Sequence, residues 1–143
     1  MRVLVDANVV MDALIGRMPF FEQSDQVLKL CGEKRFEGYL AAHTVTNLFY
    51  LLRKFYSDDK RRDVLLGLFD IFRIEQIDEA RLRSALLRSD FKDFEDCLQV
   101  ECAAAVQAEY IVTRNVRDFT TSAVPPIRPD VFCALFDGEG NLE

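Results

Sequence analysis

Short strand-like runs alternate along this chain with longer segments of helical periodicity, and that order constrains its fold more than any other feature. Residues 2–5, 36–41 and 110–113 have the length and the apolar or β-branched content of short strands. Residues 73–77 alternate in the way a strand does, and Ile127 is expected to add an edge strand. Because no hairpin signal separates these runs, the pattern predicts an α/β fold in which a mainly parallel sheet carries helices on both faces.

The intervening segments have apolar side chains at the three- and four-residue spacing that one face of a helix requires. Turn and capping residues mark where these helices start and stop. The expected helices run from about Pro19 to Gly32, from Thr44, from Ser57 with Asp58 or Asp59 as N-cap, from Asp78, from Asp93 to about Ala108, and over 131–136.

The composition is that of an ordinary globular protein. Half of the 143 residues are hydrophobic and 29% are charged, so we expect a single domain over residues 1–137 and a short frayed tail at 138–143. No apolar run approaches the roughly 20 residues that span a bilayer. Asp6 interrupts the N-terminal run too early for a signal peptide, so we expect a cytoplasmic protein that does not enter a membrane.

Histidine, cysteine and net charge narrow the function. The four cysteines form no CxxC pair and His43 is the single histidine, which gives a zinc site little support. The net charge of −6 argues against a protein that holds nucleic acid by bulk charge. It does not argue against an enzyme that meets phosphate through bound metal ions, because metal-binding acids contribute to the negative total.

Carboxylates lie close behind the strand-like runs. Asp6 directly follows the first run, and Asp118 lies five residues beyond Thr113. Asp96 is one turn into an expected helix and three residues after Asp93, so these two side chains share a helix face. Unpaired carboxylates are costly to desolvate, and parallel sheets bind ligands at the carboxyl ends of their strands. Several acids at one such edge therefore predict a hydrolytic metal site.

Three of these four acids, Asp6, Asp93 and Asp118, also have a purely structural interpretation. Asp6 fits the N-cap of the helix that follows it, and the N-cap interpretation is favoured for Asp93. Asp118 fits a turn. Thr113 and Asn115 lie near the same edge, and each either organises that turn or supports the site through hydrogen bonds. Arg114 is either a ligand of phosphate oxygens or a surface charge.

Two further groups of side chains leave their roles open. The basic residues at 53–54 and 60–62 form either a solvated face or a contact to nucleic acid. Phe20, Phe21 and Tyr56 belong either to the core or to the interface of a homodimer.

In their order and spacing, three motifs resemble the PIN domain family over nearly the whole chain. They are Asp6-Ala7-Asn8-Val9 after the first strand, Asp96 at the start of a late helix, and Thr113-Arg114-Asn115 through Asp118-Phe119. The resemblance implies a three-layer α/β/α sandwich with a central, mainly parallel sheet. It also implies an Mg²⁺- or Mn²⁺-dependent endoribonuclease with RNA as its substrate.

The resemblance assigns roles to individual positions. It implies that Asp6, Asp96 and Asp118 bind the metal and are the catalytic acids. Asn115 falls where many members carry a further acid, Thr113 matches a supporting hydroxyl, and Asn8 matches the polar residue that braces the first acid. The family includes the VapC-like toxins of bacterial toxin–antitoxin pairs, so an antitoxin protein that covers the acidic edge is an expected partner.

One position departs from the family's pattern. Most active members carry a glutamate early in the helix after the second strand, and Asn47 is the nearest match here. An amide oxygen can bind a hard cation but brings no charge. The alternative hypothesis is therefore a catalytically degenerate PIN domain that binds RNA or a protein. A phosphotransfer receiver domain, a third class, fits poorly because no matching lysine follows residues 110–113.

Overall fold

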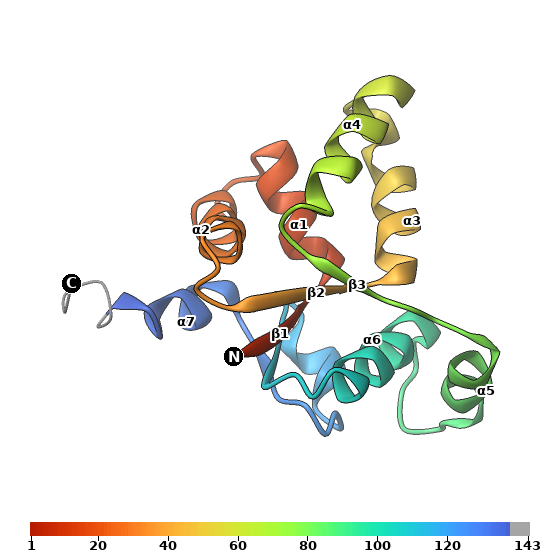
Figure 1. The fold of residues 1–143 in the computed structure, drawn as a ribbon. Coiled ribbons are helices and arrows are strands. Elements are labelled where there is room, and N and C mark those ends of the chain that lie inside the picture. Colours follow the sequence, from red (N-terminus) through yellow and green to blue (C-terminus); the bar gives the residue numbers. More distant parts are fainter. Residues whose placement is uncertain (138–143) are drawn as a thin grey trace.

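A five-stranded sheet forms the centre of the computed structural model, which describes residues 1–137 (Figure 1). The expected tail at 138–143 lies outside the described residues. The strands are β1 (Arg2–Val5), β2 (Glu37–Ala41), β3 (Arg73–Glu75), β4 (Tyr110–Val112) and β5 (Pro126–Ile127). Their order is β3-β2-β1-β4-β5, and all neighbouring strands are parallel, which confirms the predicted sheet.

Helices occupy the segments between the strands. They are α1 (Ala7–Ile15), α2 (Phe21–Gly32), α3 (Ala42–Leu51), α4 (Asp58–Leu68), α5 (Glu79–Leu87), α6 (Phe94–Ala105) and α7 (Pro129–Ala134). Two short 3-10 helices, η1 (Leu52–Lys54) and η2 (Val116–Phe119), follow α3 and β4. Among the described residues, no helix has both the length and the apolar character needed to cross a membrane.

Several helix boundaries differ from the sequence expectation. Helix α2 begins at Phe21 and not at Pro19, α3 begins at Ala42 and not at Thr44, and α7 spans Pro129–Ala134 and not 131–136. Ser57, rather than Asp58 or Asp59, caps α4, because its hydroxyl accepts a hydrogen bond from the Lys60 backbone N–H at 3.2 Å. The two aspartates lie in the first turn of that helix, where their negative charges interact favourably with the positive end of the helix dipole. The helix that begins after Asp93 ends at Ala105 and not near residue 108, because residue 107 turns the chain with a φ of 57°.

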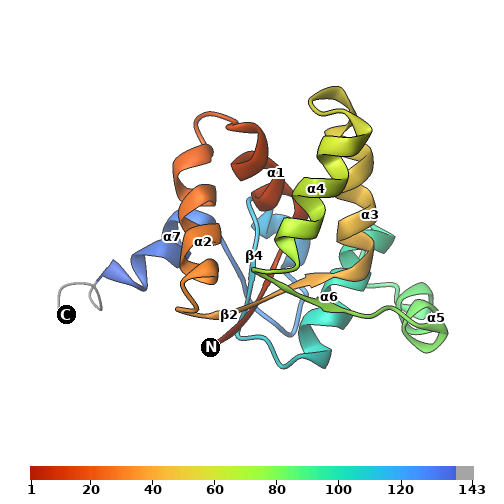
Figure 2. The same cartoon turned by 45° about the horizontal axis from the view of Figure 1, so that its top comes forward.

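Alternation along the strands divides the molecule into three layers. Val3 and Val5 pack into a cluster with α1, α2, α3, α4 and α7 on one face of the sheet, whereas Leu4 packs on the other face against α6. Figures 1 and 2 show α5 and α6 on the side of the sheet opposite α1, α3 and α4. The three-layer α/β/α sandwich is therefore confirmed.

The strand order positions the site at the carboxyl edge of β1 and β4. From β1, strands β2 and β3 extend to one side, while β4 and β5 extend to the other. The backbone of Asp6 connects the ends of β1 and β4, since its N–H donates to the Val112 carbonyl at 2.9 Å. Ligands of open parallel sheets bind at such a reversal of strand order.

Candidate functional site

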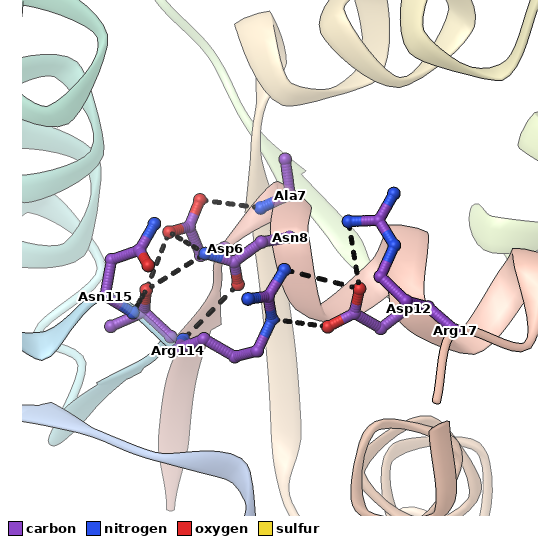
Figure 3. A network of polar contacts seen from close by, with 8 residues as sticks. Asp6, Ala7, Asn8, Asp12, Arg17, Arg114 and Asn115 are labelled. Carbon is purple, nitrogen blue, oxygen red and sulfur yellow. Dashed lines mark hydrogen bonds and ion pairs between the residues drawn. The ribbon is translucent and has the colours of Figure 1, made fainter. Parts of the chain in front are cut away.

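Asp6 lies at the centre of a hydrogen-bond network that joins three parts of the chain. It caps α1, with its carboxylate accepting the Ala7 N–H at 2.7 Å. The same carboxylate accepts the Thr113 hydroxyl at 2.8 Å, the Gln99 amide at 3.1 Å and the Asn8 amide at 3.3 Å. The N-cap interpretation of Asp6 is confirmed, and the cap leaves the residue inside a polar cluster (Figure 3).

Burial sets the protonation behaviour of Asp6. Desolvation raises the pKa of its carboxyl group, and the donors Thr113, Ala7 and Gln99 offset only part of that rise. The negative charge of Asp118 raises the pKa further. A neighbouring cation would lower the pKa of this buried carboxyl group again, because a positive charge stabilises the ionised form.

Gln99 and Thr44 are site residues that the sequence pattern did not indicate. Both side chains are almost completely buried, and the Gln99 amide donates to the Thr44 hydroxyl at 3.3 Å as well as to Asp6. The Gln99 carbonyl oxygen is buried and has no hydrogen-bond partner among the described residues. One signal was available, because Gln99 lies three residues after Asp96 and therefore on the same helix face.

Asp93 and Asp96 lie in different environments at the start of α6. Asp93 caps α6, accepting the Asp96 backbone N–H at 3.0 Å, which confirms the cap. The carboxylate of Asp96 is half-buried and has no hydrogen-bond or ion-pair partner in residues 1–137. Burial and the negative charges of Asp93, Asp6, Asp118 and Glu95 raise its pKa to about 7. Asp96 therefore lacks the counter-charge that its surroundings call for.

Asp6 and Asp96 open into one cavity of about 480 Å³. Three amide side chains, those of Asn8, Asn47 and Asn115, share its lining. Asp118 is exposed on η2 and lines a neighbouring hollow of about 400 Å³ together with Asp93 and Asp96. Asp96 thus lines both the cavity and the hollow. Asp118 does not line the cavity that contains Asp6, and it affects Asp6 and Asp96 only by electrostatic repulsion.

The donors fit a hard cation, although they do not form a closed ligand cage. Within residues 1–137, no three His, Cys, Asp or Glu side chains are grouped closely enough to hold one metal ion. Mg²⁺ seldom requires such a cage, because it keeps several waters and is commonly held by one or two carboxylates together with substrate phosphates. Asp6, Asp96 and the amide oxygens of Asn47 and Asn115 supply donors of this hard, oxygen-only kind.

Arg114 is held by a partner that the sequence analysis did not single out. Its guanidinium donates to the carboxylate of Asp12 at 2.5 and 3.4 Å and stacks over the Phe20 ring at 4.1 Å. Asp12 is completely buried, and Arg17 approaches it from the other side at 3.5 Å (Figure 3). Arg114 is therefore neither a free surface charge nor a lining residue of the cavity that contains Asp6 and Asp96. An acid within the apolar run of α1 was the sequence signal for this pair.

Thr113 and Asn115 take part in the turn after β4, which is one of the two interpretations that the sequence left open for them. The Thr113 hydroxyl accepts the Asn115 N–H at 3.0 Å, and the Asn8 side chain accepts the Arg114 N–H at 3.4 Å. Asn8 also donates to Thr113 at 3.4 Å. The loop that carries Asn115 and leads to Asp118 is thereby tied to Asp6.

Comparison with known proteins assigns this architecture to a family. The model of the PIN domain matches residues 2–117. The chain belongs to the PIN domain family. Among curated proteins, this PIN domain is similar to Ribonuclease VapC1 of Aquifex aeolicus (strain VF5), with 25% identity over 138 residues that cover 92% of this chain and 93% of the relative.

Solved structures share the fold of this PIN domain at lower identity. VapC20 of Mycobacterium tuberculosis, described as a toxin that cleaves the sarcin–ricin loop, aligns with a TM-score of 0.70 and 16% identity over 89% of this chain and 99% of that one. A toxin–antitoxin complex from Klebsiella pneumoniae aligns with a TM-score of 0.66 and 22% identity over 89% and 97% of the two chains. FitAcB from Neisseria gonorrhoeae aligns with a TM-score of 0.62 and 24% identity over 89% and 97%.

Proposed function

We propose that this PIN domain is a Mg²⁺- or Mn²⁺-dependent endoribonuclease that hydrolyses phosphodiester bonds in RNA. The observation that carries the proposal is the carboxylate of Asp96, which is half-buried, unpaired within the described residues and surrounded by acids that raise its pKa. A divalent cation is the ligand that such a carboxylate lacks. The relative named as a ribonuclease supports the choice of RNA as the substrate.

In this proposal, Asp6 and Asp96 hold the cation and Asp118 adds negative charge from the adjoining hollow. Asp6 is oriented before any ligand arrives, because donors from α1, α6 and the loop after β4 fix its carboxylate. A bound cation of this kind lowers the pKa of a water molecule and stabilises negative charge on the phosphate. Asn47 and Asn115 are placed to orient water or phosphate oxygens beside it.

The test is cleavage of RNA by the purified protein with Mn²⁺. Asp96→Asn removes one charge and preserves the shape of the side chain, and it should abolish cleavage. Glu95→Gln is the matched control, because it makes the same change at an exposed neighbouring position and should leave cleavage intact. Equal cleavage by wild type and Asp96→Asn contradicts the proposal.

A second candidate function is a PIN domain that binds RNA or a protein without cutting. Asn47 favours it, because this residue lines the cavity with an amide where most active members have a glutamate. Calorimetric titration with Mn²⁺ separates the two candidates. Heat that disappears in Asp96→Asn supports the nuclease, whereas the binding module predicts no Mn²⁺ binding that depends on this carboxylate.

We further propose that the protein is the toxin of a toxin–antitoxin pair, with an antitoxin as its partner. Structural neighbours that are toxin–antitoxin complexes support this proposal. An antitoxin is expected to cover the acidic edge, and a basic side chain of the antitoxin would compensate the negative charges around Asp96. A neighbouring reading frame that encodes a small DNA-binding protein, and that relieves growth arrest when co-expressed, is the expected result. Growth that is insensitive to the PIN domain alone contradicts the toxin role.

A further inference from the structure

The cavity that contains Asp6 and Asp96 does not end at the acids. Its lining continues to the end of α3 and η1, where Tyr50, Lys54 and Phe55 take part in it. We call this part of the lining, formed by Arg17, Tyr50, Leu51, Arg53, Lys54 and Phe55, the aromatic groove. The acids and the aromatic groove therefore share one continuous space.

Two aromatic rings are exposed in the aromatic groove. Tyr50 is 58% exposed and Phe55 is 52% exposed. The guanidinium of Arg53 lies 3.7 Å from the centre of the Tyr50 ring and donates to the Tyr50 carbonyl at 2.9 Å. Arg53 thus packs on the Tyr50 ring while more than half of the residue remains open to solvent. An exposed ring beside a cation is a suitable stacking surface for a flat ligand.

The aromatic groove is positively charged although the chain as a whole is negative. Arg53 and Lys54 line it without an ion-pair partner among residues 1–137, whereas the net charge of the chain is −6. Arg17 also lines it and shares the carboxylate of Asp12 with Arg114. Lys54 has no ion-pair partner among residues 1–137, so its ammonium group is available to an anion. Cations interleaved with aromatic rings form the kind of surface that tracks a phosphate backbone and stacks its bases.

We infer that the aromatic groove binds unpaired RNA nucleotides next to the bond that is cleaved. A base stacks on Tyr50, and Lys54 contacts the backbone phosphates. This inference rests on the proposed function, because it assigns a base-stacking surface for the RNA beside the same acids. Unpaired nucleotides are favoured over a duplex, because only an unstacked base can offer its face to a protein ring.

The first experiment measures binding apart from cleavage. Fluorescence anisotropy with a labelled single-stranded RNA is carried out on the Asp96→Asn protein, alone and combined with a groove substitution. Tyr50→Ala should weaken binding about 5- to 150-fold, as expected for the loss of one base stack. Tyr50→Phe should bind within about twofold of the parent, because it keeps the ring. Phe69→Ala is the matched control, since Phe69 is 49% exposed but lies outside the groove lining.

The second experiment assigns the stack to a nucleotide. RNAs with a single abasic site at successive positions are compared on the parent protein and on Tyr50→Ala. An abasic site at one or two positions next to the cleaved bond should weaken RNA binding to the parent protein. In Tyr50→Ala, an abasic site at those positions should cause no further loss of binding. Equal binding by parent and Tyr50→Ala, or equal affinity for a blunt duplex, overturns the inference.

The outcomes separate this inference from the proposed function. If wild type cleaves RNA and Tyr50→Ala cleaves it equally well while losing a protein partner, the aromatic groove is a protein-docking surface and the inference is wrong. If wild type cleaves no RNA but single-stranded RNA still binds in a Tyr50-dependent way, the inference is supported and the nuclease proposal fails.

Discussion

Arg114 and Arg17 contact the same buried carboxylate from different environments, and replacing each one tests how burial sets the value of an ion pair. Asp12 is completely buried, whereas the side chain of Arg114 is 23% exposed and that of Arg17 is 42% exposed. Arg114→Met and Arg17→Met each remove one cation and keep an unbranched apolar stem. The two substitutions are therefore matched in chemistry and differ in the environment of the cation.

The expected magnitudes differ because Arg114 is the better-buried partner. Removing one member of a buried pair costs about 3–5 kcal/mol when the remaining charge loses its main partner. After Arg114→Met, Asp12 keeps only the longer 3.5 Å contact with the more exposed Arg17, which compensates its charge in part. The partial exposure of Arg114 places Arg114→Met at the lower end, near 3 kcal/mol, and the lost stacking on Phe20 adds about 0.5–1 kcal/mol. Arg17→Met removes a 3.5 Å contact of a more exposed group and should cost about 0–1 kcal/mol.

Urea unfolding followed by circular dichroism measures both values, and thermal unfolding provides a second measurement. A loss of about 3 kcal/mol should lower the Tm by roughly 6–12 °C in a protein of this size. The effect of Arg17→Met should shrink in high salt, whereas that of Arg114→Met should persist. Equal destabilisation by the two substitutions would refute the reasoning, because burial of the partner would then not set the strength of the pair.

Three further predictions concern the acids and their supports. The unfolded chain releases the Asp96 proton near pH 3.8 and the folded protein near pH 7, so the metal-free protein should lose stability as the pH rises through this interval. Asp96→Asn should then stabilise it by about 1–2 kcal/mol at pH 8, after allowance for solvent screening, and by little at pH 4 in urea unfolding. Glu95→Gln removes only the weakest of the charges that act on Asp96 and should give a smaller gain. Gln99→Leu should reduce the cleavage rate with Mn²⁺ about 10- to 100-fold with the fold retained by circular dichroism, and an unchanged rate would contradict a positioning role. Asn47→Glu should tighten Mn²⁺ binding about tenfold in calorimetry, and weaker binding would show that the amide is the better ligand in this chain.

The parts of the structure that follow from local periodicity were predictable, and those that depend on long-range pairing were not. The strands and the caps at Asp6 and Asp93 are encoded within a few residues, and both caps are present. Asp12 and Arg114 are 102 residues apart in the sequence, and Asp6 and Gln99 are 93 apart. Neither contact produces a local pattern. A buried acid in an apolar helix indicates only that some cation must lie nearby.

The same distinction explains why the acids were easier to find than their supports. A carboxylate that follows a strand stands out in the sequence because apolar residues surround it. Gln99 and Thr44 are neutral side chains, and each becomes part of the site only when α3 and α6 meet at the end of β1. Their burial is a property of the packed structure, and the only sign of it in the sequence was the position of Gln99 three residues after Asp96.

The carboxylate of Asp6 is fixed by hydrogen bonds, whereas those of Asp96 and Asp118 are not. This difference affects how a cation can bind where Asn47 replaces the glutamate of most active members. Asp6 accepts donors from α1, α6 and the loop after β4, whereas Asp96 and Asp118 accept none from the described residues. A preoriented carboxylate such as Asp6 needs little reorganisation to bind a cation. The carboxylates of Asp96 and Asp118 become ordered only when they bind a cation or another ligand.

Magnesium commonly completes its coordination with water and substrate phosphates. In the proposed enzyme, Lys54 and Arg53 attract those phosphates into the cavity that contains Asp6 and Asp96. The RNA then supplies the negative charge that Asn47 does not. An amide at this position therefore lowers affinity for the free ion more than affinity for the ion together with RNA, and the substitution is compatible with catalysis.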